Sequence, residues 1–365
     1  MRKTIRWAVW GAGAIANKVI SDLHLVESAT LHAAGARNIE RARSFAQQHG
    51  AARSYDSLPA MLQDAAIDIV YVATPHHLHM QDCIACIEAG KAVLCEKPFT
   101  LNATQAQRVV DAARRHKVFC MEAMWTRFIP AVKEVKRLVD SGAIGRVRLM
   151  QGTFAFAATP NPASRLFDPV MGGGALLDIG IYPVSFAHHM LGAPEMVRGL
   201  ATIGDTGVDV QSTYQLHYSG GALADLSASL LVPGHNEFIL YGETGTLRLC
   251  KPFYSAHRFV LEQHALPVAH HAALANPAGL RKLLASPAAR SLRRRLSSLA
   301  AAWPSGRSHT LPFPGYGYQF ELTEVCRCLR EQRTESDTMP LQHTLEVMRM
   351  MDELRSQWGL VYPQE

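Results

Sequence analysis

The segment Ile5–Ala16, with the sequence IRWAVWGAGAIA, decides the fold of this chain. An apolar run ends at Trp10, a glycine turn follows at once, and a helix-like pattern begins within the turn. Glycine permits the sharp bend and lets backbone N–H groups reach a pyrophosphate at the N-terminus of the helix. The unit is typical of dinucleotide binding, and a glycine turn with a merely structural role is the alternative. The candidate cofactor contacts in the turn are Gly11, Gly13, Ala14 and Ile15.

Short apolar runs alternate with helix-length segments as far as residue 121. The predicted strands are Ile5–Trp10, Thr30–Ala34, Ile67–Ala73, Ala92–Cys95 and Val118–Met121. The predicted helices between them include Ile39–His49, His76–Ala89 and Asn102–His116. Strands that are apolar on both faces and alternate with helices indicate a parallel sheet covered on both sides. We therefore expect an α/β protein whose residues 1–124 form a doubly wound Rossmann domain.

The hydrophobic period changes to two in the second half of the chain. Residues Val208–Tyr218 alternate in polarity, Ser219–Gly221 forms a plausible turn, and Ala222–Leu230 alternates again. Such strands have one dry face and one wet face, which favours an antiparallel sheet. We expect residues 125–365 to form an α+β domain with a large, open, mostly antiparallel sheet. A closing helix at Leu341–Gln357 would pack back on the first domain.

Composition narrows the class of protein. The chain has 365 residues, a formal charge of +6 and seven scattered cysteines. No signal-peptide pattern and no apolar run of about 18 residues is present, which argues against secretion and membrane spanning. An odd, scattered cysteine set makes no disulfide framework, so we expect a reducing cytoplasm.

The positive charge is concentrated in one segment. Between Glu262 and Glu321 there is no acidic residue, and seven basic residues lie there, more than the whole net charge of +6. A solvated surface insertion within residues 271–308 explains this excess, so it is weak support for nucleic-acid binding. Contact with an anion or a partner is the alternative.

The end of the second predicted strand indicates which cofactor binds. NAD sites usually carry an acidic residue there, bonded to the ribose 2′-hydroxyl. Here the strand ends in AAGARN, residues 33–38, without an acid. The guanidinium of Arg37, joined by Arg41 one helical turn later, could instead pair with a 2′-phosphate. NADP is therefore favoured over NAD, and the alternative is that both are ordinary surface arginines.

Two further motifs carry candidate chemistry. Glu96-Lys97-Pro98 follows a predicted strand, at the end where doubly wound sheets place their ligands. Asp178 and Tyr182 are four residues apart, so a helix would place them on one face. The alternatives are that Lys97 is an ordinary lysine at a strand end, that Asp178 caps a helix and that Tyr182 packs in the core. Histidines at 76, 77, 79, 188 and 189 lack companion carboxylates or cysteines at ligand spacing, so we predict no metal site.

Over nearly its whole length the chain resembles the glucose-fructose oxidoreductase, inositol dehydrogenase and MocA (Gfo/Idh/MocA) family. Within it, the resemblance is to the dimeric dihydrodiol and NADP-dependent D-xylose dehydrogenases. The matching words occur in the right order and are residues 11–16, 73–79, 89–98, 121–128, 172–182 and 359–364. The dihydrodiol branch has tyrosine at the position of Tyr182, where many inositol-type members have histidine. Many members have asparagine where this chain has His76, and the basic residues 281–307 have no counterpart in the dihydrodiol pattern.

The resemblance implies a role for each matching position. Lys97 would lie at the reacting oxygen, Tyr182 would exchange its proton, and Asp178 would orient both. On the cofactor side it implies contacts from Thr74, His76, His79, Glu96 and Lys97. On the substrate side it implies Trp125, Phe154, Asp178 and Tyr182, and Arg127 is either substrate-facing or structural.

A free tyrosine has a pKa of about 10, and a neighbouring ammonium favours the phenolate and lowers that pKa. We therefore predict an NADP-dependent oxidoreductase that interconverts hydroxyl and carbonyl groups on a sugar, polyol, cyclic diol or dicarbonyl. The alternatives are an anhydrosugar reductase or inositol dehydrogenase with the same device, and a non-catalytic NADP-binding regulatory protein. Family members commonly dimerise through the open sheet, so we expect a homodimer or a higher oligomer.

Overall fold

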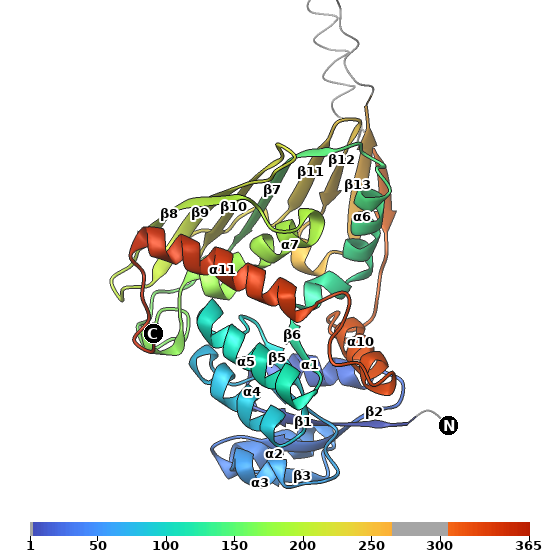
Figure 1. Cartoon of the computed structure of the whole chain (residues 1–365), viewed down its shortest axis with the longest axis vertical. Coiled ribbons are helices and arrows are strands. Elements are labelled where there is room, and N and C mark those ends of the chain that lie inside the picture. Colours follow the sequence, from blue (N-terminus) through green and yellow to red (C-terminus); the bar gives the residue numbers. More distant parts are fainter. Residues whose placement is uncertain (1–2, 265–305) are drawn as a thin grey trace, which may run out of the picture.

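Two sheets organise the molecule, one in each half of the chain (Figure 1). The computed structural model describes residues 3–264 and 306–365. Most of the basic segment predicted as a surface insertion, residues 271–308, lies outside these ranges. The α/β class and the two kinds of sheet predicted from the sequence are confirmed.

The first sheet has six parallel strands in the order β3-β2-β1-β4-β5-β6. Its strands are β1 (Ile5–Trp10), β2 (Ala29–Gly35), β3 (Arg53–Tyr55), β4 (Ile69–Val72), β5 (Ala92–Glu96) and β6 (Cys120–Ala123). Its helices are α1 (Ala14–Leu23), α2 (Ile39–His49), α3 (Leu58–Leu62), η1 (His76–Leu78), α4 (His79–Glu88) and α5 (Ala103–His116). The order reverses direction beside β1, which is the place where doubly wound sheets bind dinucleotides.

Sequence periodicity located most of these elements. The bounds of β1 and α2 agree with the prediction. The predicted strand Val118–Met121 was placed two residues early, because β6 runs from Cys120 to Ala123. The edge strand β3 was missed: it has three residues and no alternation that could distinguish it from a loop.

The second sheet has eight strands in the order β14-β13-β12-β11-β7-β10-β9-β8. They are β7 (Val147–Ala155), β8 (Met196–Ile203), β9 (Asp209–His217), β10 (Leu223–Ser229), β11 (Phe238–Gly242), β12 (Gly245–Leu249), β13 (Arg258–Gln263) and β14 (Arg307–Thr310). Among the described strands of this second sheet, only the β7–β10 pair is parallel. The sheet is therefore mixed and mostly antiparallel.

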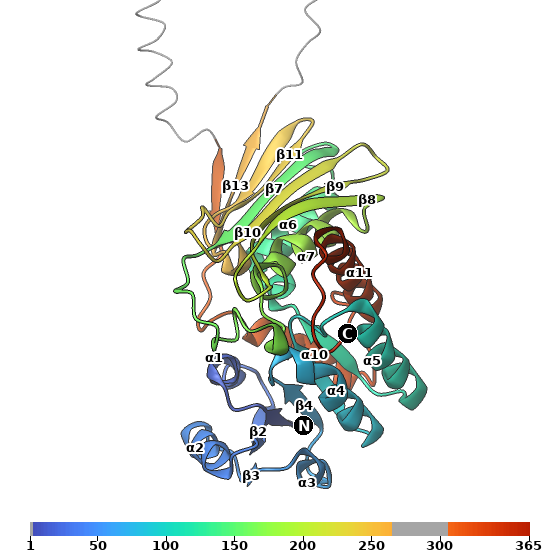
Figure 2. The ribbon, with the colours of Figure 1, turned by 90° about the vertical axis from the view of Figure 1, so that its left-hand side faces the viewer.

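Helices lie on the face of this sheet that is turned toward the first half of the chain (Figures 1 and 2). They are α6 (Pro130–Asp140), α7 (Ile181–Leu191) and α11 (Leu341–Trp358). The other helical segments are η2 (Trp125–Phe128), η3 (Pro169–Met171), η4 (Leu176–Gly180), η5 (Phe253–Ser255) and α10 (Gln319–Arg330), which packs against α1. The segment Pro169–Leu191 is long and apolar enough to cross a membrane by composition, but 89% of its most apolar window is buried inside the protein. It is a core segment of the fold.

Helix α11 contacts both halves of the chain. It packs against α5 on one side and against β8 and α7 on the other. Thr344 Oγ1 donates to Glu122 Oε2 at 3.0 Å, and Asp352 Oδ2 accepts from the backbone N–H of Ala103 at 2.7 Å. These contacts seat the C-terminal helix on the end of the first sheet and place the second sheet over it.

Candidate active site

A cleft of about 1040 Å³ opens where the carboxyl ends of β1, β2, β4 and β5 face the second half of the chain. One end is lined by the glycine turn and by the residues that follow β2. The other end is lined by residues of β5, β7, η4 and α7 that the sequence marked as catalytic candidates. The lining residues that we predicted are Gly11, Gly13, Ala14, Ile15, Arg37, Arg41, Thr74, His76, Glu96, Lys97, Phe154, Asp178 and Tyr182.

The glycine turn has the shape that a bound nucleotide requires. Gly11 adopts a φ of +109°, and a Cβ there would lie 2.5 Å from the carbonyl carbon of Ala73. Gly13 is different, because a Cβ placed on it would meet nothing within 4 Å. The first glycine is thus needed for close backbone packing, and the second faces open space at the start of α1. A pyrophosphate fits this cradle, where it would meet the N-terminus of the helix.

Cations gather at the end of the cleft beside β2. Arg37, Arg41 and Lys18 all line it, and Arg37 is the second residue after β2. Asn38 between them accepts a hydrogen bond from the backbone N–H of Arg41 at 3.0 Å and so caps α2. A 2′-phosphate could bind among these cations, whereas no acidic side chain lies at the end of β2 to accept a ribose hydroxyl.

Lys97 projects from the end of β5 into the other end of the cleft. Its Nζ donates to the carbonyl oxygen of Asp178 at 2.6 Å and lies 3.3 Å from Asp178 Oδ1. The same Nζ lies 5.0 Å from the ring centroid of Tyr182. Burial alone would lower the pKa of Lys97, but Asp178 and Tyr182 raise it above its ordinary value. The side chain therefore stays an ammonium.

Asp178 holds two cations at once. In addition to Lys97, its Oδ1 accepts a hydrogen bond from Arg165 Nη1 at 2.8 Å. Burial would raise the pKa of Asp178, yet the two cations hold it well below its usual range. Arg165 also lines the cleft, and its side chain is 59% exposed. Arg165 was not predicted from the sequence, because it lies in a loop that carries no motif.

The turn that carries Asp178 is not the α-helix that the spacing suggested. Leu176–Gly180 is a single π-helical turn that runs directly into α7. Asp209 Oδ2 accepts a hydrogen bond from the backbone N–H of Leu176 at 2.8 Å and fixes the start of this turn. Such wide turns occur frequently at functional sites. Here the turn presents Asp178 and Tyr182 to the same ammonium.

The phenol of Tyr182 is held by a tryptophan. Trp125 Nε1 donates to Tyr182 Oη at 3.2 Å, and both side chains are buried. Lys97 lowers the pKa of Tyr182, as expected from the sequence, but this is not the largest effect on the phenol. Burial raises this pKa above its ordinary value, and it outweighs the lowering by Lys97 and Trp125. Lys97 lowers the pKa of the buried phenol, but not enough to bring it below the ordinary value of tyrosine.

Aromatic side chains form one wall of this end of the cleft. Phe154 stacks on Tyr254 with ring centroids 4.3 Å apart, and it lies 5.3 Å from the ring of Tyr182. Phe156 lines the cleft beside Phe154. Tyr254 was not predicted, since it comes from the short η5 segment after β12, far along the chain. Trp125 contacts the same group from behind, with its ring 6.2 Å from Tyr254.

The loop after β4 lies under the cleft. Thr74 Oγ1 donates to Asp82 Oδ2 at 2.8 Å, and burial raises the pKa of Asp82. His76 lines the cleft, and its Nδ1 lies 3.0 Å from the carbonyl oxygen of Gly172. Burial, then His79 and Lys97, lower the pKa of His76 to about 3, so its ring is neutral. His79 is fully buried between the carbonyl oxygens of Pro98 and Thr74 and supports the loop from below.

Glu96 lines the cleft next to Lys97. Tyr71 donates a short hydrogen bond to Glu96 Oε1, and Oε2 accepts one from the backbone N–H of Lys97 at 3.2 Å. Burial raises the pKa of Glu96. Glu321 from α10 is buried behind this pair with both carboxyl oxygens unbonded among the described residues, and burial raises its pKa strongly. Neither Tyr71 nor Glu321 lies in a sequence pattern that predicts a position near the site.

Arg127 does not line the cleft, and its sequence-based assignment to the substrate is not supported by its position. Arg127 is 1% exposed, and its guanidinium bonds Ser185 of α7. No group of three histidine, cysteine or acidic residues in the described chain could hold a metal ion.

The two halves match two family models. Residues 5–124 match the oxidoreductase family with an NAD-binding Rossmann fold, and residues 132–248 match the GFO/IDH/MocA C-terminal domain. The chain belongs to the GFO/IDH/MocA family. Trans-1,2-dihydrobenzene-1,2-diol dehydrogenase from Danio rerio is 32% identical, with 99% of each chain covered. The human enzyme of that name is 28% identical, also with 99% of each chain covered. This GFO/IDH/MocA protein is therefore an NAD(P)-dependent oxidoreductase of the dihydrodiol dehydrogenase type.

Solved structures of more distant proteins share its fold. An aldose-aldose oxidoreductase from Caulobacter crescentus, solved with glycerol, gives a TM-score of 0.80 at 20% identity, and 98% of each chain is covered. A levoglucosan dehydrogenase solved with NADH and levoglucosan gives 0.80 at 19% identity, with 97% of each chain covered. A 3-ketoreductase from Actinomadura kijaniata with NADP and TDP-benzene gives 0.78 at 23% identity, with 97% of this chain and 98% of the other covered. At these identities the comparisons show only that this GFO/IDH/MocA protein has a similar fold.

Proposed function

We propose that this protein uses NADP to interconvert a hydroxyl and a carbonyl group on a small sugar, polyol, cyclic diol or dicarbonyl. One observation carries the proposal. An ammonium, Lys97, and a buried phenol, Tyr182, meet at one end of the same cleft whose other end is the glycine turn. A lysine–tyrosine pair is a metal-free device for moving a proton at a reacting oxygen.

Each residue of the group has a distinct task in this proposal. Tyr182 Oη takes the proton of the substrate hydroxyl during oxidation and returns it to the carbonyl oxygen during reduction. Lys97 stabilises the phenolate form, and Asp178 keeps Lys97 in place through the contacts at 2.6 and 3.3 Å. When bound, the nicotinamide ring supplies or accepts the hydride. Trp125 holds the phenol oxygen from the other side.

The preference for NADP over NAD rests on charge at the end of β2. Arg37 and Arg41 line the cleft where the ribose of a bound nucleotide would lie, with Lys18 nearby. Guanidinium groups bind phosphate oxygens in a bidentate manner, which suits a 2′-phosphate. Thr74, His76 and Glu96 lie between this end and Lys97 and would contact the rest of the cofactor.

The aromatic wall favours a ring-shaped or partly apolar substrate. Phe154 and Phe156 line the cleft with their rings, Tyr254 stacks on Phe154, and the same cleft is lined by polar groups such as Arg165. A cyclic diol or a sugar ring has one apolar face and hydroxyl groups at its edge, which suits this combination. A screen with NADP or NADPH against aldoses, inositols, anhydrosugars, dihydrodiols and dicarbonyls, followed at the nicotinamide absorbance band, identifies the substrate. Turnover confined to anhydrosugars or to inositols would support the other dehydrogenase types of this family.

Variants separate an enzyme from a non-catalytic NADP-binding protein. Lys97→Met and Tyr182→Phe should bind NADPH with nearly the wild-type affinity and lose about 10²- to 10⁴-fold in turnover, the usual contribution of a positioned acid–base group. Tyr254→Phe is the matched control, because it removes a phenol from the same aromatic wall and should retain turnover. Wild-type rates in both of the first two variants would rule out the mechanism.

We also propose that the protein is a cytoplasmic homodimer or higher oligomer that associates through the second sheet. Large apolar side chains are exposed on its strands β8 and β10, with Leu200 79%, Met196 48% and Leu223 49% exposed. The helices lie on the opposite face of that sheet (Figure 2). Exposed apolar patches of this kind mark protein interfaces. A monomer in sedimentation at micromolar concentration would contradict the proposal.

A further inference from the structure

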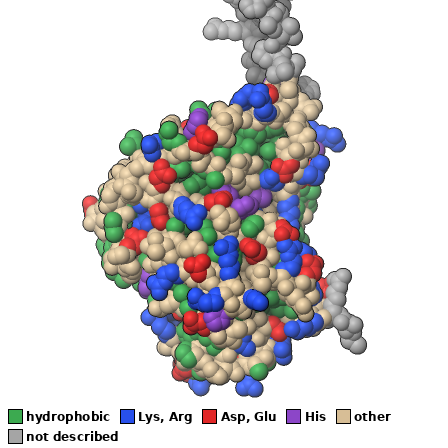
Figure 3. Space-filling view, viewed as in Figure 1, with side chains coloured by type: hydrophobic (Ala, Val, Ile, Leu, Met, Phe, Trp, Pro, Cys, Tyr) green, Lys and Arg blue, Asp and Glu red, His purple; other side chains and the backbone are tan. Residues whose placement is uncertain are grey.

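A second hollow, of about 710 Å³, lies at the C-terminal end of α7, apart from the cofactor cleft. Side chains from η2, α6, α7 and the start of α11 converge on it. The basic and imidazole groups in its lining are Arg127, Lys133, Lys136, His188, His189 and His343. Histidine side chains gather with basic ones near the middle of the face shown in Figure 3. The proposed reaction uses none of these six residues.

Arg127 is the deepest of these groups, and Glu122 and Glu346 act on its charge without forming a hydrogen bond or an ion pair with it among the described residues. Its guanidinium bonds Ser185 Oγ at 3.0 Å, His343 Nδ1 at 3.2 Å and His188 Nδ1 at 3.4 Å. None of the carboxylates in residues 3–264 and 306–365 forms an ion pair with it. A buried guanidinium that has only neutral hydrogen-bond partners is costly, and a bound anion would offset that cost.

The histidines are arranged as neutral neighbours of this guanidinium. His188 Nε2 lies 2.7 Å from Glu346 Oε2, so Nε2 carries the proton and Nδ1 accepts from Arg127. His343 also turns Nδ1 to Arg127, which leaves its Nε2 proton without an acceptor among the described residues. His343 is partly exposed and therefore offers a hydrogen-bond donor to a ligand in the hollow.

Two lysines of α6, Lys133 and Lys136, also contribute positive charge to the lining of the hollow. Lys133 is exposed and forms no ion pair with an acid in the described parts of the chain; its Nζ lies 5.7 Å from the ring centroid of Phe128. Lys136 is bonded at 2.5 Å to Asp140, one turn later, whose side chain is 56% exposed. Lys133 is thus available to an anion, and Lys136 could share its charge with one.

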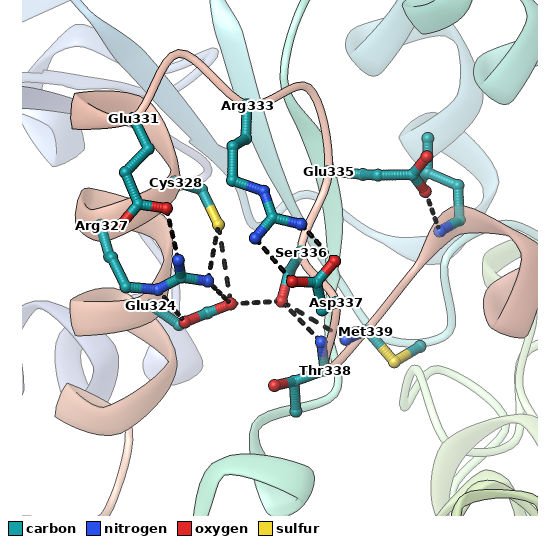
Figure 4. Close-up of polar contacts among 11 residues, drawn as sticks. Glu324, Arg327, Cys328, Glu331, Arg333, Glu335, Ser336, Asp337, Thr338 and Met339 are labelled. Atoms are coloured by element: carbon teal, nitrogen blue, oxygen red, sulfur yellow. Dashed lines mark hydrogen bonds and ion pairs between the residues drawn. The ribbon is translucent and has the colours of Figure 1, made fainter.

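The acidic residues nearby are already engaged. Asp337, on the rim, is bound by both terminal nitrogens of Arg333 within its own loop, as Figure 4 shows. Ser336 donates to Glu324 Oε1 at 2.6 Å and ties this loop to α10. Glu346 accepts from Gln342 and His188. These carboxylates therefore have other hydrogen-bond partners, and within the described residues none of them forms an ion pair with Arg127 or Lys133.

We propose that this hollow is a binding site for a small oxyanion that presents a phosphate or sulfate group. Arg127 contributes a buried, permanently charged donor, Lys133 a mobile one, and His343 a neutral N–H, so several oxygens of one tetrahedral group can be bonded at once. A cation is disfavoured because the lining holds three cationic side chains and one carboxylate, Asp337, which Arg333 already binds. The proposal is independent of the function proposed for the cofactor cleft.

Isothermal titration with inorganic phosphate, at ionic strength held constant with chloride, tests the proposal. NADP is kept saturating so that phosphate does not occupy the Arg37 and Arg41 end of the cleft. We expect one saturable site per chain. The variant Lys133→Gln/Lys136→Gln should weaken it about tenfold, the loss expected when charged donors are removed. The matched control, Arg108→Gln/Arg114→Gln, removes two exposed charges from α5 and should change the dissociation constant less than twofold.

Two results would overturn the site. One is the absence of saturable binding in the wild-type protein. The other is equal weakening by the lysine pair and by the control pair, which would show only a general effect of net charge. A second titration without nucleotide, on Arg37→Ala/Arg41→Ala, should give the same phosphate affinity. Binding retained there separates this site from the cofactor cleft, so its outcome does not depend on whether NADP is the cofactor; binding lost there would assign the phosphate to the cleft.

Discussion

Trp125 Nε1 donates a hydrogen bond to Tyr182 Oη at 3.2 Å, deep in the wall of the cofactor cleft. The indole is 5% exposed and the phenol 8%. This contact changes the interpretation of Trp125, which the sequence suggested only as an apolar surface over the substrate. A donor on the phenol oxygen favours the phenolate, and it therefore acts in the same direction as the ammonium of Lys97.

Replacing Trp125 with phenylalanine should consequently slow oxidation more at neutral than at alkaline pH. Burial already raises the pKa of Tyr182, and losing the donor raises it further. The base form is needed for oxidation, so the rising limb of the kcat profile should move to higher pH. One hydrogen bond of about 1–1.5 kcal/mol corresponds to a loss of roughly tenfold at pH 7. Trp358→Phe removes an indole donor bonded to Gly199 O at 2.9 Å, far from the cleft, and should leave the profile unchanged. An unshifted limb in Trp125→Phe would argue against a functional hydrogen bond.

Changing the two glycines of the first turn to alanine should have different effects, on stability for Gly11 and on NADPH binding for Gly13. Gly11→Ala forces a side chain into a φ of +109° and within 2.5 Å of the backbone of Ala73, so it should lower the free energy of unfolding by about 2 kcal/mol or more. Gly13→Ala meets no atom within 4 Å and should leave stability nearly unchanged. Its new methyl group would occupy space at the nucleotide cradle and weaken NADPH binding. Urea unfolding and fluorescence titration separate the two effects, and equal destabilisation by both changes would be contrary to this explanation.

The glycine turn and Lys97 show how much of the structure could be predicted from the sequence. Both lie at the ends of strands whose apolar runs define them, and parallel strands bring such ends to one edge. Local pattern therefore predicted both the fold of the first half and the position of its cleft. The contact of Lys97 with Asp178 needed the family resemblance, because 81 residues separate the two and no periodicity relates them.

The parts that were missed depend on tertiary packing. Arg165 and Tyr254 come from irregular segments, and only the folded chain brings them to Asp178 and Phe154. Arg127 was a candidate substrate contact because it lies within the family-matching residues 121–128, and a structural role was the alternative. In the short helix η2, however, residues two positions apart point in different directions, so Arg127 turns away from the cleft. The sequence predicted the lowering of the Tyr182 pKa by Lys97, whereas the larger, opposite effect of burial cannot be read from the sequence around Tyr182.

Replacing the two arginines beside β2 should weaken the binding of NADP and leave the binding of NAD nearly unchanged. In Arg37→Ala/Arg41→Ala we expect the dissociation constant for NADP to rise about 10- to 100-fold, since charge-assisted hydrogen bonds contribute about 1.5–3 kcal/mol each. NAD lacks the 2′-phosphate, so its dissociation constant should change less than threefold. Arg43→Ala is the control, because Arg43 lies on the same helix, is 63% exposed and bonds Glu40. Equal weakening of NADP and NAD would show that the arginines do not recognise the 2′-phosphate.

Asp209 makes stability depend on pH. It is fully buried, bonds the backbone N–H of Leu176, and has no partner for Oδ1 among the described residues. Burial raises its pKa to about 6, above the ordinary value of 3.8. The folded protein therefore binds a proton more tightly than the unfolded chain does, and stability falls as the pH rises from about 4 to 6.

Asp209→Asn keeps an oxygen for Leu176 and removes the buried charge. It should raise the free energy of unfolding at pH 8 by about 1–3 kcal/mol and have a smaller effect at pH 5, where the carboxyl of Asp209 is mostly protonated in the folded state. The measurement is urea unfolding at the two pH values. Asp225→Asn, on the exposed face of β10, is the matched control and should give a difference close to zero at pH 8. A gain that is equal at pH 5 and pH 8 would mean that the charge of Asp209 is not the cause, because only the ionised carboxylate is penalised by burial.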